Sequence, residues 1–110
     1  MNSLQKNIIG PLSPSQLHII SINTSTLTIS WSPNLLWEDY AHIDYYNISV
    51  TRKGNSSLIL STFVELTTFT FTDNSHAPCT EFEFDISAVS GEYGESSKSV
   101  IVGGFESGIS

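Results

Sequence analysis

The sequence predicts an all-β domain, a sandwich of seven antiparallel strands arranged in two sheets. The composition is rich in Ser and Thr but poor in Ala, Gln, Lys and Arg, so residues that favour helices are scarce. Apolar residues recur at every second position in several short segments, which is the period of a half-buried strand. Turn residues separate these segments at regular intervals. A chain of 110 residues is expected to form one domain with one core.

The most regular segment covers residues 80–89, where apolar and polar residues alternate. One face carries Phe82, Phe84, Ile86 and Ala88, and the other carries Glu81, Glu83, Asp85 and Ser87. Because neighbouring side chains of a strand point to opposite faces, we expect one buried and one solvated face here. The three acids lie about 7 Å apart along the strand, too far to hold one cation. We interpret them as a solvated surface, or alternatively as a docking surface for a basic partner.

Six other strands are expected at residues 17–22, 26–32, 45–52, 58–66, 67–72 and 97–102. In the last of these, Val100 and Val102 are expected to point inward. Glycine and proline residues mark the chain on either side of the strands. We therefore expect a linker at residues 1–13, a folded domain at 14–103 and a tail at 104–110.

Four segments, in matching order and spacing, resemble a fibronectin type III domain over residues 11–102. They are Pro14, the run 27–33 that contains Trp31, the pattern Tyr46-x-Ile48-x-Val50, and the run 78–89 followed by Gly94. The resemblance implies an immunoglobulin-like sandwich of fibronectin type III topology, with Trp31 filling the core and Tyr46 packed beside it. Phe82 stands where the family carries a tyrosine whose hydroxyl bonds back to the preceding loop. Phenylalanine keeps the buried ring but loses that hydrogen bond, which is worth about 1 kcal/mol.

The charge and the scattered histidines exclude several classes of function. With 11 acidic and 4 basic residues, the net charge is −7, so no basic patch is available for nucleic acid. No segment is apolar for long enough to insert into a bilayer. His18, His42 and His76 lie in separate segments without a nucleophile motif. We therefore expect no catalytic residue, no metal site and no cofactor, and the chain is not expected to be an enzyme.

Three sequons make Asn23, Asn47 and Asn55 candidate N-glycosylation sites. Asn23 and Asn55 fall in predicted turns, and Asn47 is expected on the outer face of its strand, so a glycan at any of them would leave the core intact. The lone Cys79 excludes an internal disulfide and is either a small inert residue or an intermolecular site. The sequons and the family resemblance together favour an extracellular or cell-surface location.

Aromatic residues in two loops are the candidate contacts for a partner. They are Trp37 and Tyr40 in one loop, with Tyr93 nearby if the two loops share an end of the sandwich. Loop aromatics supply a large contact area at a low cost in entropy. Leu35 and Leu36 lie beside them in the sequence. The alternative is that Trp37 and Leu36 fold back and cover the core.

The function expected from these features is a non-catalytic extracellular module, used for binding or spacing in a larger receptor or adhesion protein. Its partner would be another protein or a neighbouring domain of the same chain. The alternative is an accessory domain of an enzyme whose catalytic domain lies elsewhere in the chain. A third possibility, an intracellular array of the muscle-protein kind, fits the unpaired Cys79 but gives the sequons no role. Flanking sequence would distinguish the three.

Overall fold

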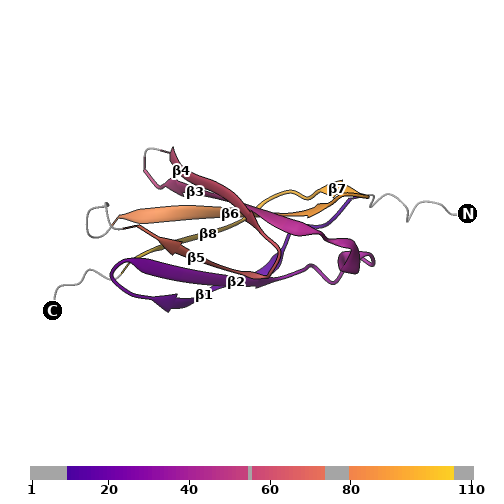
Figure 1. Cartoon of the computed structure of the whole chain (residues 1–110), viewed down its shortest axis with the longest axis horizontal. Coiled ribbons are helices and arrows are strands. Elements are labelled where there is room, and N and C mark those ends of the chain that lie inside the picture. Colours follow the sequence, from indigo (N-terminus) through magenta and orange to yellow (C-terminus); the bar gives the residue numbers. More distant parts are fainter. Residues whose placement is uncertain (1–9, 55, 74–79, 106–110) are drawn as a thin grey trace, which may run out of the picture.

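The computed structural model describes residues 10–54, 56–73 and 80–105. These residues form eight strands: β1 Ser15–Ile22, β2 Thr26–Ser32, β3 Tyr45–Arg52, β4 Ser57–Val64, β5 Thr68–Thr72, β6 Glu81–Ser90, β7 Gly94–Glu95 and β8 Ser99–Gly104. They pack as two antiparallel sheets, which confirms the predicted all-β sandwich (Figure 1). The strand beyond the predicted seven is β7, which is 2 residues long. A short 3₁₀ helix, Tyr40–His42, lies between β2 and β3. Within the described ranges no helix has the length and apolar character needed to cross a membrane.

The two sheets meet closely along one side of the sandwich and leave two strand edges on the other. One sheet has the order β1-β2-β5, and the other has the order β4-β3-β6, with β7 and β8 both paired along β6. β1 lies against β8, where a Cβ added to Gly103 would stand 2.7 Å from Ile19 Cδ1. Among the described residues β4 pairs with β3 alone and β5 with β2 alone. The side formed by β4 and β5 is therefore the open side of the sandwich (Figure 1).

The core is built from the inward faces of the central strands. It contains Leu27, Ile29, Trp31, Tyr46, Ile48, Val50, Phe71, Phe82, Phe84, Ile86, Ala88 and Phe105. The predicted alternation of β6 is confirmed, because all four of its expected inward residues are fully buried. The Trp31 and Tyr46 rings pack edge to face with centroids 5.5 Å apart, as the family resemblance implied. Each large side chain buried in this way contributes about 1.5–3 kcal/mol of hydrophobic stabilisation.

The predicted orientation of β8 is wrong. Val100 and Val102 point outward and are 54% and 37% exposed. β8 pairs with β6 so that Ile101 lies opposite Phe84, which points into the core. Gly103 also faces inward, at a position where a Cβ would clash with a neighbouring side chain. Three consecutive apolar residues fit either face of a strand, so only the pairing with β6 decides which one is buried.

Packed structure reaches beyond both expected boundaries of the domain. Phe105 falls in the predicted tail, yet it is only 9% exposed and belongs to the core. Its ring stacks on that of Phe71, with centroids 5.7 Å apart and planes 13° from parallel. In the predicted linker, the carbonyl of Ser13 accepts a hydrogen bond from Asn34 Nδ2 at 3.1 Å. Parts of the expected linker and tail are therefore parts of the fold.

Candidate functional site

The loop between β2 and β3 is held in one conformation by a series of turns. The carbonyl of Asn34 accepts a hydrogen bond from Trp37 N at 3.1 Å, and its Oδ1 accepts one from Leu36 N at 3.1 Å. Tyr40 N then donates to the carbonyl of Trp37 at 3.2 Å. An Asn that bonds to its own backbone two residues ahead is a common way to begin such a turn. These contacts fix the direction in which each side chain of the loop points.

The turn between β6 and β7 packs against this loop. Gly91 N donates to Asp44 Oδ2 at 2.6 Å, which joins the turn to the end of the loop. The ring of Trp37 packs edge to face on that of Tyr93, with centroids 5.4 Å apart. The ring of His42 also packs edge to face on Tyr93, with centroids 5.8 Å apart. The two loops predicted as possible neighbours therefore do meet at one end of the sandwich.

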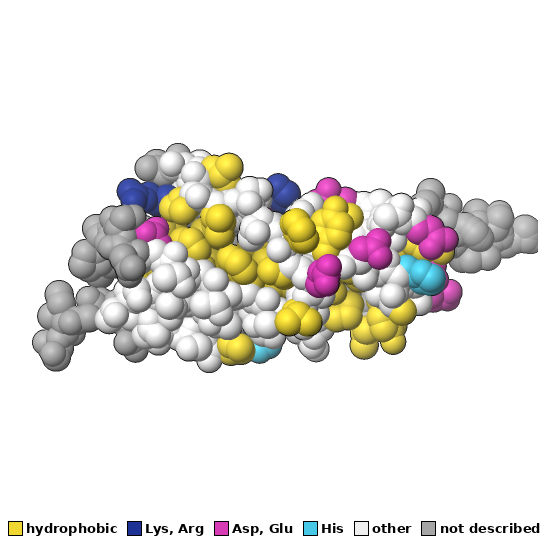
Figure 2. Space-filling model, in the orientation of Figure 1, with side chains coloured by type: hydrophobic (Ala, Val, Ile, Leu, Met, Phe, Trp, Pro, Cys, Tyr) yellow, Lys and Arg dark blue, Asp and Glu magenta, His cyan; other side chains and the backbone are white. Residues whose placement is uncertain are grey.

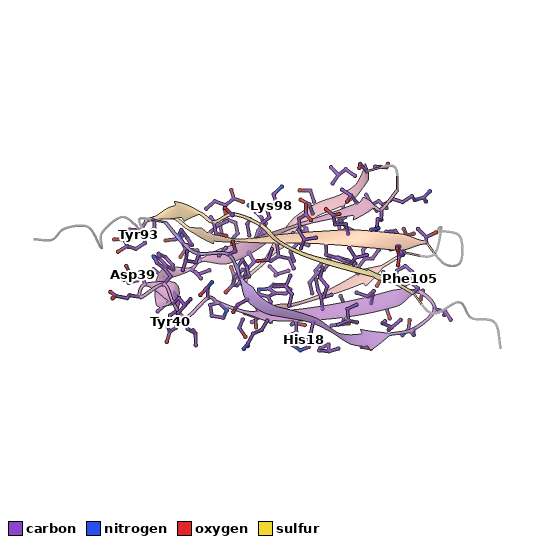
Figure 3. The ribbon with its side chains drawn as sticks, turned by 180° about the vertical axis from the view of Figure 1, so that it is seen from behind. His18, Asp39, Tyr40, Tyr93, Lys98 and Phe105 are labelled. Carbon is purple, nitrogen blue, oxygen red and sulfur yellow. The ribbon has the colours of Figure 1, made fainter. Side chains whose placement is uncertain are left out.

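Large side chains project into solvent at this end. We call Leu35, Leu36, Tyr40, His42 and Tyr93 the loop-end surface. Leu35, Leu36 and Tyr40 are 64%, 84% and 42% exposed, and Tyr93 is half-buried. Figure 3 shows Tyr40 and Tyr93 at the same end of the molecule, opposite Phe105. Apolar groups exposed together on a fixed loop are a feature of interaction surfaces rather than of solvated turns.

Acidic groups surround the Tyr93 hydroxyl at the loop-end surface. Loss of solvation raises the pKa of Tyr93, and the charges of Asp39 and Glu92 raise it further. The Tyr93 hydroxyl also bonds to the Asp39 carboxylate, which raises this pKa in the same direction. His42 Nδ1 lies 3.6 Å from Glu92 Oε1, but both side chains are largely exposed, so this pair adds little stability.

Trp37 differs from the other two candidate contact residues in its exposure to solvent. Trp37 is 3% exposed and lies beneath Tyr93, so its ring is not available to a partner in this conformation. Trp37 packs inward, as the alternative held, whereas Leu36 does not. Nothing in the sequence distinguishes these adjacent apolar residues, because a loop lacks the periodicity that assigns faces in a strand. Contact through Tyr40 and Tyr93 stays a prediction.

The sequons differ in how their asparagines are held. Asn23 lies in the exposed turn between β1 and β2, where its Oδ1 accepts hydrogen bonds from Ser25 N at 3.1 Å and Thr26 N at 2.8 Å. Its Nδ2 makes no hydrogen bond to the described residues. Asn47 lies on the outer face of β3, and its Nδ2 is engaged by another side chain. Asn55 and Cys79 lie outside the described residues.

Glu95 joins three strands in a cluster that the sequence did not predict. Its Oε2 accepts hydrogen bonds from Ser87 Oγ at 2.6 Å and from Asn47 Nδ2 at 3.1 Å. The hydrogen bond from Ser87 lowers the pKa of Glu95, and the hydrogen bond from Asn47 lowers it further by a smaller amount. A lowered pKa means that this carboxylate supports the fold above its ordinary pKa and loses that effect as the pH falls through the folded value. The contact depends on β7 turning back along β6, and no local pattern signals it.

A second acidic pair lies on the outer face of β6. The hydrogen bond to Asp85 raises the pKa of Glu83, and the negative charge of Asp85 raises it further, while Lys53 has a smaller opposite effect. Asp85 Oδ1 is shielded from solvent and has no hydrogen-bond partner among the described residues. On the neighbouring strand β8, Val100 lies opposite Asp85 and Val102 lies opposite Glu83. The outward valines and the acids thus form one surface.

We predict that Glu83→Gln raises the free energy of unfolding at pH 7 but leaves it nearly unchanged at pH 3. A carboxyl with a raised folded pKa stabilises the fold when it is protonated, and that contribution is lost as the pH rises from its ordinary value through the folded one. Glutamine keeps the hydrogen bond to Asp85 without the repulsion. Urea unfolding at the two pH values measures the difference, with Glu81→Gln on the same face as the matched control. Equal effects of both substitutions at pH 7 would contradict the assignment.

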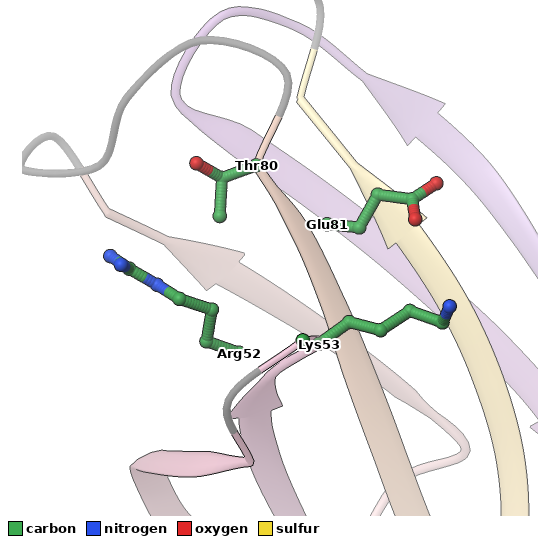
Figure 4. A pocket seen from close by; sticks show the side chains of 5 residues that line it. Arg52, Lys53, Thr80 and Glu81 are labelled. Atoms are coloured by element: carbon green, nitrogen blue, oxygen red, sulfur yellow. The ribbon is translucent and has the colours of Figure 1, made fainter.

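A pocket at the other end of the sandwich is lined by Arg52, Lys53, Gly54, Thr80 and Glu81. The side chains of Lys53 and Glu81 extend to one side of it and that of Arg52 to the other (Figure 4). Lys53 N also donates to the carbonyl of Glu81 at 2.9 Å. With an acid among its bases, the pocket has no clear preference for an anion. No three His, Cys, Asp or Glu side chains in the described ranges are grouped so as to hold a metal ion.

Several solved structures share this fold. The FN5 domain of Drosophila Lar is 22% identical with a TM-score of 0.62, over 89% of this chain and 99% of that one. The twitchin kinase region from C. elegans is 21% identical with a TM-score of 0.69, over 84% of this chain but 16% of that one. Domains d3–d4 of the rat CD45 extracellular region are 15% identical with a TM-score of 0.68, over 86% of this chain and 49% of that one. At these identities the likeness shows the fold alone.

The family itself is shown by the sequence. Comparison with curated protein sequences gives no match. The family profile described as "Fibronectin type III domain" matches residues 12–103, which is most of the chain. The matched range contains the paired Trp31 and Tyr46 and every strand from β1 to β7. The chain therefore belongs to the fibronectin type III family.

Proposed function

We propose that this domain is a non-catalytic binding and spacer module of a larger extracellular receptor or adhesion protein, and that it contacts its partner through the loop-end surface. Fibronectin type III domains are typically modules of multidomain proteins and are generally non-catalytic. The partner is another protein or a neighbouring domain of the same chain. The observation that carries the proposal is the exposure of Leu35, Leu36 and Tyr40 on a loop whose conformation is fixed.

A fixed loop is suited to binding because little entropy is lost when the partner arrives. Trp37 beneath the loop and the hydrogen bonds of Asn34 already hold the exposed side chains in place. Acidic residues surround the apolar centre, with Glu38 and Glu92 both exposed. A complementary partner would have an apolar pocket for Leu36 and a basic rim, the usual arrangement of a protein interface.

The entry of the chain into the domain supports a role for neighbouring domains. Gly10 lies against the turn between β6 and β7, where an added Cβ would stand 3.2 Å from the carbonyl oxygen of Tyr93. The chain therefore reaches the domain beside the loop-end surface. A domain that precedes this one in a longer chain would lie within reach of Tyr40 and Leu36.

The extracellular part of the proposal is supported by the sequons. Asn23 combines an exposed turn with a free Nδ2, the atom to which a glycan is attached, and its Oδ1 keeps the hydrogen bonds of the turn. Asn47 is less suitable, because its Nδ2 donates to Glu95. The rat CD45 region of the same fold is an extracellular one.

The full-length protein in its native cells tests both parts of the proposal. We expect glycopeptide mapping to find a glycan on Asn23 at higher occupancy than on Asn47. We also expect a photoreactive benzoylphenylalanine at position 36 to cross-link to a second protein or to a neighbouring domain. The matched control carries the same group at position 66, because Leu66 is also exposed but lies in the loop between β4 and β5.

The extracellular location and the use of the loop-end surface can be contradicted separately. Bare sequons in a protein recovered from the cytosolic fraction would contradict the extracellular location. Cross-linking at position 36 no stronger than at position 66 would contradict the use of the loop-end surface, wherever the protein is located.

A further inference from the structure

An aromatic pair lies on the outer face of the sheet formed by β4, β3 and β6. Phe63 of β4 is 60% exposed. Its ring packs against that of Tyr45 on β3, with centroids 5.2 Å apart and planes 56° from parallel. Figure 2, which views the open side of the sandwich, shows hydrophobic and acidic side chains next to one another in the half nearer the N-terminus. More than half of the Phe63 side chain is therefore open to a ligand.

The strand register places a fixed carboxylate near this pair. Phe63 lies directly opposite Asn47, and Asn47 lies directly opposite Ser87 on β6. The Glu95 carboxylate accepts hydrogen bonds from both Asn47 and Ser87 through its Oε2. Residues opposite one another in a sheet have Cβ atoms about 5 Å apart, so this carboxylate lies within about 10 Å of Phe63. We call Tyr45, Asn47, Phe63 and Glu95 the aromatic–carboxylate site.

The groups left free at this site attract positive charge. Glu95 Oε1 and Asn47 Oδ1 accept no hydrogen bond from the described residues. Glu95 is exposed and its pKa is lowered by the hydrogen bonds from Ser87 and Asn47, so it is a carboxylate at neutral pH. Lys98 has a smaller effect on that pKa and forms no ion pair with Glu95 in the described structure. The faces of the two aromatic rings add negative potential of their own.

We propose that the aromatic–carboxylate site binds the side chain of an arginine from a partner protein. An arginine laid across the site covers the Phe63 ring and donates N–H groups to Glu95 Oε1 and Asn47 Oδ1. The charge of the chain favours this ligand, because the net charge is −7 and Asp85 and Glu83 follow on the same face of β6. An arginine fits better than a lysine, because its planar guanidinium stacks on a ring and donates to two acceptors at once.

A neutral sugar is another ligand that stacks on exposed aromatic rings. Sugar hydroxyls both donate and accept hydrogen bonds, so a sugar needs donors as well as acceptors from the protein. The donors nearest to the ring are already engaged, because Asn47 Nδ2 and Ser87 Oγ both donate to Glu95. A cationic ligand needs only acceptors and ring faces, which favours arginine. The site shares no residue with the loop-end surface, so it provides a second place of contact.

Titration of the 110-residue chain with short peptides tests the proposal. The probes are acetyl-Gly-Arg-Gly-amide and acetyl-Gly-Lys-Gly-amide at low salt, followed in two-dimensional amide NMR spectra. We expect the arginine peptide to shift the amide signals of Phe63, Asn47 and Glu95, with a Kd at least about threefold below that of the lysine peptide.

Two variants separate the charge from the ring. Glu95→Gln keeps an amide oxygen for the hydrogen bonds of Ser87 and Asn47 but removes the charge, and it is expected to raise the Kd of the arginine peptide at least about fivefold. Phe63→Ala removes an exposed ring and is expected to raise this Kd at least about threefold. The amide spectrum of each variant also reports whether it is folded.

Glu81→Gln is the matched control. It removes the same charge from an exposed position on the outer face of β6 and is expected to leave the Kd within about twofold of the wild type. Equal losses for Glu81→Gln and Glu95→Gln, or equal Kd values for the two peptides, would show general attraction to an acidic surface and overturn the proposal. So would the absence of any shift at the highest soluble peptide concentration, or a methyl glucoside that shifts the same signals at a lower concentration than the arginine peptide.

Discussion

Replacing Trp37 with alanine is expected to lower the free energy of unfolding by about 3–5 kcal/mol, although the residue belongs to a surface loop. Its ring is buried and supports Tyr93, so truncation removes apolar burial and leaves a cavity under the loop-end surface. The backbone of Trp37 also closes two successive turns, but those hydrogen bonds survive the substitution. Guanidinium unfolding followed by tyrosine fluorescence and circular dichroism measures the loss. For a domain of this size such a loss is a large share of the total stability.

Leu36→Ala in the same loop is the matched control, and its expected effect is within about 0.5 kcal/mol because the side chain already faces solvent. The two variants have opposite consequences for binding. Leu36→Ala is expected to weaken partner contact in a stably folded domain. Equal stability changes for the two variants would mean that Trp37 leaves the core in solution and that its ring is open to a partner after all.

The fold was predictable because burial imposes a period of two on strands. In β6 that period places four apolar residues on one face, and the family pattern around Trp31 and Tyr46 then aligns the sheets. The orientation of β8 was not predictable in this way. Apolar residues fill both faces of β8, and the choice depends on its pairing with β6, which turns Ile101 and Gly103 inward.

The candidate site was less predictable than the fold, because its contacts join distant segments. Asn47 and Glu95 are 48 positions apart and meet because β7 returns along β6. Trp37 and Leu36 are adjacent and of similar hydrophobicity, yet one is buried and the other is exposed. The backbones of both residues bond to Asn34, yet Trp37 packs on Tyr93 and Leu36 faces solvent, a difference that only coordinates reveal.

Phe105→Ala is expected to lower the free energy of unfolding by about 3 kcal/mol, even though the residue follows the last strand. Its ring stacks on Phe71 and packs edge to face on Phe82 at 5.5 Å, so it closes the core at the end opposite the loop-end surface. Aromatic pairs of this kind add about 0.5–1.5 kcal/mol beyond the area that they bury.

A domain boundary drawn at residue 103 would remove this contribution, so a chain that ends there is expected to be less stable by a similar amount. Val100→Ala on the exposed face of β8 is the matched control, with an expected loss below about 1 kcal/mol. Denaturant midpoints of the full chain and the three altered chains measure these losses. If the chain ending at 103 unfolds at the same denaturant concentration as the full one, Phe105 contributes nothing to the core.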